Sequence, residues 1–124
     1  MIIGIGTDII EIDRIKKAVD NDKHSFIQRV FSERETAYFE KNQWGPETIA
    51  GSFAAKEAVM RALGTGLRGF KFKDIEVLRD KLGKPVVKLS NNANRIAKDK
   101  NIKAIHLSIS HCREYALAYA TAEN

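Results

Sequence analysis

The chain has 124 residues, which is the size of one domain and excludes two. Hydrophobic residues make up 44% and charged residues 30%, with only 2 Pro and 8 Gly, so a disordered or fibrous chain is excluded as well. The formal charge of +5 fits an anionic partner, which can be nucleic acid, a phosphorylated small molecule or an acidic protein, and it equally fits mere solubility. We expect one globular domain over residues 1–124.

The apolar start of the chain predicts a strand and no membrane anchor. Residues 2–10 are rich in isoleucine, but Asp8 interrupts them and the run is far shorter than the roughly 20 residues of a membrane helix. This composition favours a largely buried strand. Alternation puts Gly4, Gly6 and Asp8 on one face, and the glycines predict open space beside the carboxylate. The single cysteine, Cys112, fits a reducing cytoplasm, so we expect a cytoplasmic protein.

Helical patterns dominate the next part of the chain. Residues 13–19 and a segment that begins at Ser25 have helical spacing, and residues 32–35 match a capping box for a helix that runs to about Lys41. A long helix follows, with Pro46 in its first turn and Gly64 at its end. Two of its rows lie side by side: Ala50, Ala54, Ala58 and Ala62, and then Ile49, Phe53, Glu57 and Arg61. The alanine row permits close approach of a neighbouring element.

The remainder of the chain reads mainly as strands. Residues 74–79 and 84–89 predict a hairpin after a glycine-containing loop. Ser90 is the expected cap of a helix that ends near residue 101, and residues 104–110 and 115–120 alternate as two more strands. The sequence therefore predicts an α+β fold with a mostly antiparallel sheet and one long helix.

Two carboxylates are the first candidates for chemistry. Asp8 stands near a strand end, where capping a helix is an ordinary role, and Glu57 stands four residues before Arg61, where a surface ion pair is equally ordinary. The functional alternative is that Asp8 and Glu57 converge on one Mg²⁺, because that ion takes one or two carboxylates together with water and substrate phosphate oxygens. Lys56 and Arg61 would then neutralise the phosphates.

Two further groups of residues have open interpretations. Residues 108–111 read Ser-Ile-Ser-His, and without a GxSxG elbow they do not indicate a serine nucleophile. The hydroxyls of Ser108 and Ser110, with His111, can bind a phosphate, order a neighbouring lysine or remain a polar surface. The basic region that contains Arg14 and Arg29, with Phe26 nearby, can dock an acidic helix or be solvated surface.

Four motifs occur together and in order along nearly the whole chain: Gly4–Ile9, Phe53–Ala58 with Gly64-Thr65-Gly66, Gly83-Lys84-Pro85 and Ser108–His111. In this the chain resembles the holo-[acyl-carrier-protein] synthases, the small bacterial type of 4′-phosphopantetheinyl transferase. The resemblance implies their fold and their reaction. In that reaction 4′-phosphopantetheine moves from coenzyme A to a serine of apo acyl carrier protein, and adenosine 3′,5′-bisphosphate is released.

The resemblance also assigns site residues. Asp8 and Glu57 would hold Mg²⁺, and Lys56 would contact the transferred phosphate. Arg61, where relatives commonly have Lys, and Gly64 would contact coenzyme A. Ser108 and His111 would contact it from a neighbouring subunit of a homotrimer, while Arg14, Phe26 and Arg29 would bind the carrier protein. Ser52 departs from the Arg that is usual before the Phe of this motif.

Two other classes of function would use some of the same features. A basic non-enzymatic RNA-binding module would use the positive charge, but the chain has neither an RNP aromatic pair nor a GXXG loop. A metal-dependent phosphohydrolase would share Asp8 and Glu57, but a two-metal site needs additional His or Asp ligands. We expect the transferase.

Overall fold

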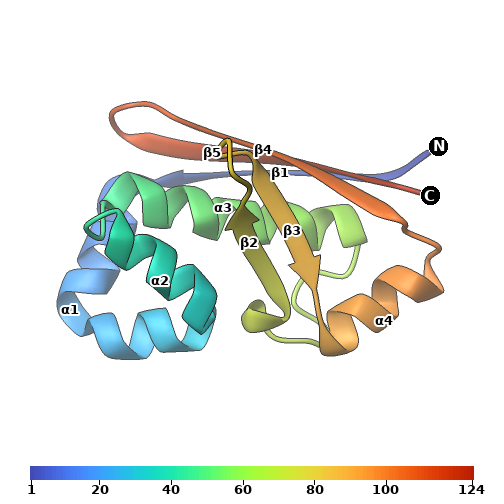
Figure 1. The fold of residues 1–124 in the computed structure, drawn as a ribbon, viewed down its shortest axis with the longest axis horizontal. Coiled ribbons are helices and arrows are strands. Elements are labelled where there is room, and N and C mark those ends of the chain that lie inside the picture. Colours follow the sequence, from blue (N-terminus) through green and yellow to red (C-terminus); the bar gives the residue numbers. More distant parts are fainter.

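The computed structural model describes residues 1–124 and has the expected α+β architecture, with antiparallel strand pairs throughout (Figure 1). Its elements in chain order are β1 (Ile2–Glu11), α1 (Ile12–Val30), α2 (Glu33–Lys41), α3 (Pro46–Leu63), the short 3-10 helix η1 (Phe72–Asp74), β2 (Ile75–Arg79), β3 (Pro85–Leu89), α4 (Asn91–Asp99), β4 (Ala104–His111) and β5 (Tyr115–Glu123). None of its helices has the length and apolar character needed to cross a membrane.

A three-stranded sheet and the long helix α3 form the centre of the molecule. The strand order is β1-β5-β4, and the hairpin β2-β3 makes a separate two-stranded sheet. Figure 1 shows α3 running along one face of the larger sheet, with α1 and α2 at one end and α4 at the other. The chain termini lie together at one end of the sheet, where the backbone N–H of Asn124 donates to the carbonyl of Met1.

Small side chains allow α3 to approach the sheet closely. The predicted alanine row is buried, and it meets an alanine row on the inner face of β5: Ala116, Ala118, Ala120 and Ala122. On β1 even alanine would be too large, because a Cβ on Gly4 would lie 2.1 Å from the carbonyl oxygen of Ala62 and one on Gly6 would lie 2.0 Å from that of Ala58. The expectation of open space beside Asp8 is therefore wrong, since the backbone of α3 fills it.

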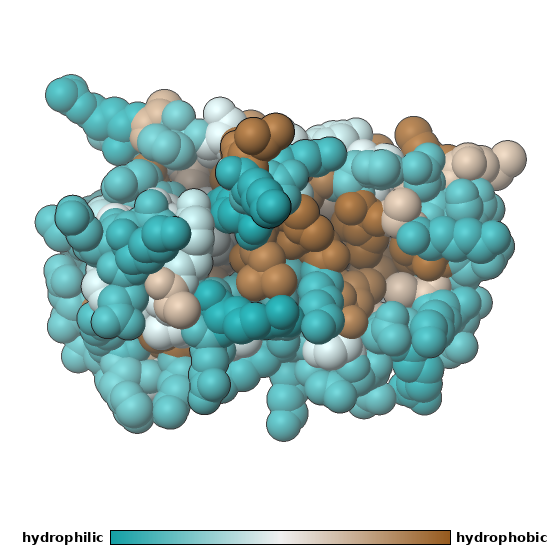
Figure 2. Space-filling model, viewed as in Figure 1, coloured by the Kyte–Doolittle hydropathy of each residue, from teal (hydrophilic) through white to brown (hydrophobic).

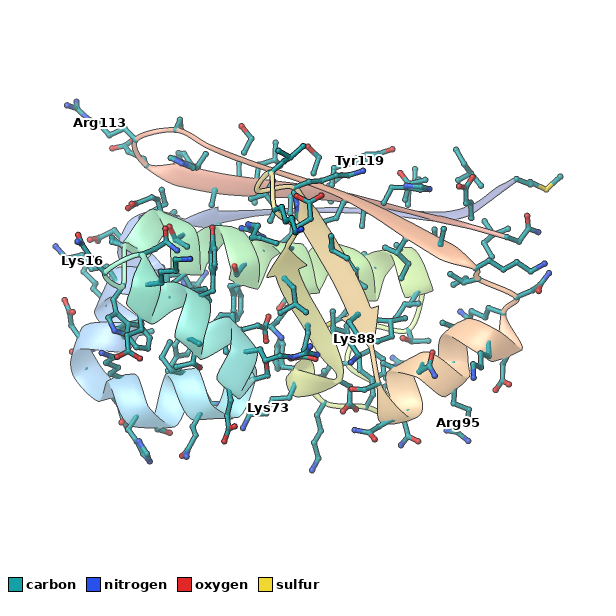
Figure 3. The ribbon with its side chains drawn as sticks, in the orientation of Figure 1. Lys16, Lys73, Lys88, Arg95, Arg113 and Tyr119 are labelled. Atoms are coloured by element: carbon teal, nitrogen blue, oxygen red, sulfur yellow. The ribbon has the colours of Figure 1, made fainter.

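The opposite face of the sheet carries exposed apolar side chains. Ile5 and Ile9 of β1 are about 60% exposed (59% and 62%), and Leu117 and Tyr119 of β5 are each 44% exposed. Figure 3 shows Tyr119 on the side of the sheet away from α3. The prediction that β1 is largely buried is thus wrong for its outer face, because a single chain offers only one layer of helices to cover the sheet.

The helices follow some of the predicted local signals and depart from others. The capping box that begins α2 is confirmed, since Ser32 and Glu35 exchange both bonds. The two helical segments before it form one kinked helix, α1, in which Asp22 is non-helical and its side chain accepts from the N–H of Ser25. Ser90 occupies the predicted N-cap position of α4, but its hydroxyl donates to the carbonyl of Asp74 and makes no capping bond to the helix.

The view in Figure 2 shows how polarity is distributed over the surface. Hydrophilic residues cover α1 and α2, whereas hydrophobic ones gather between the hairpin and the β4 side of the molecule. That apolar area includes Val87, Leu89, Ile102 and Ile105, which line a shallow depression between β3, α4 and β4. The polar helices and this apolar depression are therefore distinct surfaces.

Candidate functional site

Asp8 and Glu57 line one cleft, although 49 positions separate them in the sequence. The cleft has a volume of about 360 Å³ and lies between the end of β1, the first half of α1 and the middle of α3. Its remaining lining residues are Ile9, Ile10, Arg14, Ile15, Ala18, Phe26 and Phe53. A larger cavity of about 590 Å³ between α1 and α2 contains neither carboxylate. The smaller cleft is therefore where the predicted pair meets.

The backbone contact between β1 and α3 explains why these carboxylates converge. Gly4 lies against Ala62 and Gly6 lies against Ala58, one helical turn earlier. Asp8 follows on the same face of β1, so it reaches the level of the next turn of α3, which contains Glu57. The glycine spacing thus sets the height of Asp8 along the helix.

Both carboxylates have environments that disfavour their charge. Burial raises the pKa of Asp8, and the neighbouring Arg61 partly opposes this. Burial also raises the pKa of Glu57, and the negative charge of Asp8 raises it further. Such a pair gains from a bound cation, because a positive charge relieves both the burial of charge and the repulsion.

Neither helix capping by Asp8 nor a surface ion pair between Glu57 and Arg61 accounts for the two carboxylates. Asp8 lies within β1 and caps no helix, since Glu11 occupies the N-cap position of α1. Arg61 forms its ion pair with Asp8, at 3.6 Å between Nη2 and Oδ1, and makes none with Glu57. Arg61 itself is 61% exposed, so its guanidinium is available to an anion beside Asp8.

Lys56 does not reach this cleft. Its side chain is fully buried, and its Nζ contacts Glu35 Oε1 at 2.8 Å and donates to the carbonyls of Phe72 and Ile75. These three acceptors use all three N–H groups of the ammonium. The structure therefore differs from the expected contact between Lys56 and phosphate: residue 56 is about 100° around the helix from residue 57 and faces the interior.

Glu35 is the residue that sequence reasoning missed. Its carboxylate is 1% exposed, forms the ion pair with Lys56 and accepts the backbone N–H groups of Ser32 and Val77, each at 3.0 Å. The capping-box pattern accounts for the bond to Ser32 and predicts no distant partner. The only signal in the sequence for the ion pair was a lysine within an apolar helix, Lys56, which needs a buried acidic partner.

The other predicted residues occupy several places. Gly64 is the C-cap residue of α3, with a left-handed φ of 80°. It lines one surface depression together with Arg61. Ser108 is exposed on β4 opposite Tyr119, on the outer face of the sheet, and His111 is exposed at the end of that strand. Neither lines the cleft of Asp8.

The proposed docking residues are partly at the cleft. Arg14 and Phe26 line it, whereas Arg29 is exposed on α1 outside it. Figure 3 shows Lys16 projecting from the same helix. Ser52, by contrast, is 1% exposed inside α3, so its hydroxyl is not presented to a ligand.

Comparison with known proteins identifies the family of the chain. The model of the 4′-phosphopantetheinyl transferase superfamily matches residues 4–120. A holo-[acyl-carrier-protein] synthase of Clostridium perfringens is 54% identical over 99% of this chain and 95% of the relative.

Solved structures agree as well. The holo-[acyl-carrier-protein] synthase of Neisseria meningitidis superposes with a TM-score of 0.92 at 34% identity, covering all of both chains. That of Helicobacter pylori, in complex with coenzyme A, gives 0.85 at 32% identity, covering 96% of this chain and 99% of that one. The chain belongs to the 4′-phosphopantetheinyl transferase superfamily, among the holo-[acyl-carrier-protein] synthases.

Proposed function

We propose that the chain transfers 4′-phosphopantetheine from coenzyme A to a serine hydroxyl of apo acyl carrier protein, with Asp8 and Glu57 holding Mg²⁺. The observation that carries this is the meeting of two half-buried carboxylates in one cleft of a holo-[acyl-carrier-protein] synthase chain. The relative from Helicobacter pylori was solved with coenzyme A, which supports the same donor here.

The donor set of the cleft fits Mg²⁺. Asp8 and Glu57 offer hard carboxylate oxygens, and no group of three or more metal-ligating side chains exists in the chain. Mg²⁺ commonly takes one or two carboxylates and keeps positions for water and substrate phosphates, whereas a two-metal phosphohydrolase needs more ligands. When bound, the ion supplies charge neutralisation at the pyrophosphate oxygens.

The chain's own residues supply positioning and charge in phosphoryl transfer. The carrier serine oxygen attacks the phosphorus on the pantetheine side, and the bond from that phosphorus to the bridging oxygen breaks as adenosine 3′,5′-bisphosphate leaves. Arg61, exposed and paired with Asp8, would contact the phosphates together with backbone near Gly64. The serine proton goes to a carboxylate-held water, to Glu57 or to a substrate group.

We also propose a homotrimer with sites at subunit contacts. The exposed apolar face of the sheet supports assembly, because monomers rarely leave such a contiguous patch uncovered. Ser108 belongs to this face, and His111 is exposed at the end of the same strand. In an assembly both residues would contact the coenzyme A phosphates of a neighbouring subunit.

The carrier protein is expected to dock on α1. Arg14, Phe26 and Arg29 combine two cations with one half-buried aromatic side chain, and the net charge of +5 favours an acidic partner. A cytoplasmic location is proposed with it, supported by the unpaired Cys112.

The test is to mix the protein with apo acyl carrier protein, coenzyme A and Mg²⁺ and to follow the carrier's mass. We expect a gain of one phosphopantetheine group. Asp8→Ala and Glu57→Gln should each abolish that gain while circular dichroism shows a folded chain. Absence of a mass change with the unmodified protein rejects the transferase, and normal turnover in both variants rejects the metal site.

A further inference from the structure

A buried ion pair lies behind the cleft and joins three elements. Lys56 in α3 and Glu35 in α2 are 0% and 1% exposed, with 2.8 Å between Nζ and Oε1. Lys56 also donates to the carbonyls of Phe72 and Ile75, where η1 leads into β2. Glu35 accepts the N–H of Val77 in β2. One pair of side chains thus holds α2, α3 and β2 together.

Stability alone does not explain this pair. Removing two charges from water is costly, and an apolar pair of similar volume is often as stable as a buried ion pair. What the ion pair adds is direction, because its hydrogen bonds fix where α2 and β2 stand relative to α3. The question is which part of the molecule uses that alignment.

The bonds of Lys56 lead to the cleft of Asp8 and Glu57. Phe72, whose carbonyl accepts from Lys56 at 3.0 Å, stacks its ring on Phe53 with 5.8 Å between centroids. Phe53 lines the cleft, one helical turn from Glu57 on the same row of α3, and also contacts Phe26 at 6.0 Å between centroids. The ion pair therefore supports the aromatic wall beside Glu57.

We propose that Glu35 and Lys56 are positioning residues for the transfer reaction: the pair anchors α3 and Phe72 so that Glu57 and Phe53 keep their places in the cleft. This inference rests on the proposed function of the Asp8–Glu57 site. Lys56 acts from behind the site and Glu35 acts through Lys56, so neither touches the substrate.

Two variants test the pair. Glu35→Gln/Lys56→Met removes both charges together. It keeps an acceptor for only one of the N–H groups of Ser32 and Val77, because they bond to different oxygens of Glu35, and it loses the bonds to Phe72 and Ile75. Glu35→Asp keeps both charges but shortens the side chain by one methylene, which disturbs the contact with Lys56. It therefore tests the positioning role even if the double variant fails to fold. Arg34→Gln, which breaks the neighbouring Arg34–Glu76 pair without touching α3, is the matched control.

We expect kcat to fall about tenfold or more in both test variants, because small misplacements at a reacting centre have large effects on rate. The KM for carrier protein should stay unchanged, since α1 keeps its docking side chains. Hydrogen exchange should become faster at residues 53–57 in both test variants, at a temperature where circular dichroism shows them folded, and Arg34→Gln should match the unmodified protein throughout.

Wild-type kcat and wild-type exchange in folded Glu35→Asp, and in the double variant where it folds, would overturn the proposal. An equal loss in Arg34→Gln would also overturn it, since the effect would then be general loosening. Asp8→Ala is run alongside: if it retains transfer, the proposed metal site has failed, whereas an inactive Asp8→Ala with active pair variants isolates the failure to the positioning role.

Discussion

Gly6 in β1 lies directly against the carbonyl oxygen of Ala58 in α3, so closely that a Cβ on Gly6 would be 2.0 Å from that oxygen. Neither Gly6 nor the Ala58 carbonyl can move away easily, because both belong to the backbone of a regular element, β1 or α3. The contact holds β1 at a fixed height along α3, and Asp8 two residues later is held with it. The metal site we propose therefore depends on a position that carries no chemistry of its own.

Gly6→Ala should damage both stability and transfer. The added methyl must push β1 away from α3, and overpacking of this kind costs about 1–3 kcal/mol of unfolding free energy. We expect a melting temperature lower by several degrees and a higher Mg²⁺ requirement, as Asp8 moves from Glu57. Gly51→Ala is the control, because its methyl meets only the Ile109 side chain, at 2.9 Å. Normal Mg²⁺ dependence in a folded Gly6→Ala protein would contradict this account.

The two cleft carboxylates predict a pH-dependent stability in the absence of metal. A carboxyl whose pKa is raised in the folded state binds its proton more tightly there than in the unfolded chain, so its ionisation destabilises the fold. That penalty is absent below the ordinary value of 3.8 for Asp8, appears as the pH rises through the raised folded pKa, and is complete above it. At neutral pH, Asp8→Asn should therefore melt at a higher temperature than the unmodified protein in EDTA.

Added Mg²⁺ reverses this order. A cation bound only by the folded protein stabilises it by mass action, so Mg²⁺ should raise the melting temperature of the unmodified protein and leave that of Asp8→Asn unchanged. Thermal melts at pH 7, with EDTA and with excess Mg²⁺, measure both effects. An equal rise in the two proteins would place the ion elsewhere.

The sequence predicted the elements that depend on short-range patterns. The alanine row, the capping box of α2 and the hairpin all follow from spacing within a few residues, and each is confirmed. The pairing of the two carboxylates was predicted from Asp8 on the glycine face of its strand and Glu57 before Arg61, and by the family resemblance. Their common cleft agrees with that prediction, and their role as metal ligands stays a proposal.

Contacts between distant elements escaped the same reasoning. Glycine on a strand face signals missing volume, but only the fold reveals that the backbone of α3 fills it. The capping pattern explained one bond of Glu35 and concealed the ion pair with Lys56. Isoleucine in β1 indicated burial, yet strand propensity does not say whether both faces are covered within one chain.

The outer face of the sheet should drive assembly. We expect the unmodified protein to be a trimer by light scattering, and Tyr119→Glu to be monomeric, because a carboxylate in an apolar interface loses its water without gaining a partner. Transfer should fall with the trimer, since Ser108 lies opposite Tyr119 on that face. Arg95→Glu, on the exposed side of α4 (Figure 3), is the charge-change control and should stay trimeric. A fully active monomeric Tyr119→Glu protein would contradict the shared site.

The last prediction concerns the basic helix α1 and the carrier protein. Arg14→Glu and Arg29→Glu should each raise the KM for acyl carrier protein. In Arg29→Glu kcat at saturating carrier should change little, because Arg29 lies outside the cleft and a surface charge acts mainly on encounter and binding. The KM of the unmodified protein should rise with salt, since added ions screen exposed charges beyond about 10 Å at 0.1 M. Arg95→Glu makes the same charge change on α4 and should leave the KM near normal. Steady-state rates at several carrier and salt concentrations give each KM. A KM that changes neither with salt nor with charge reversal on α1 would show that the carrier docks on another surface.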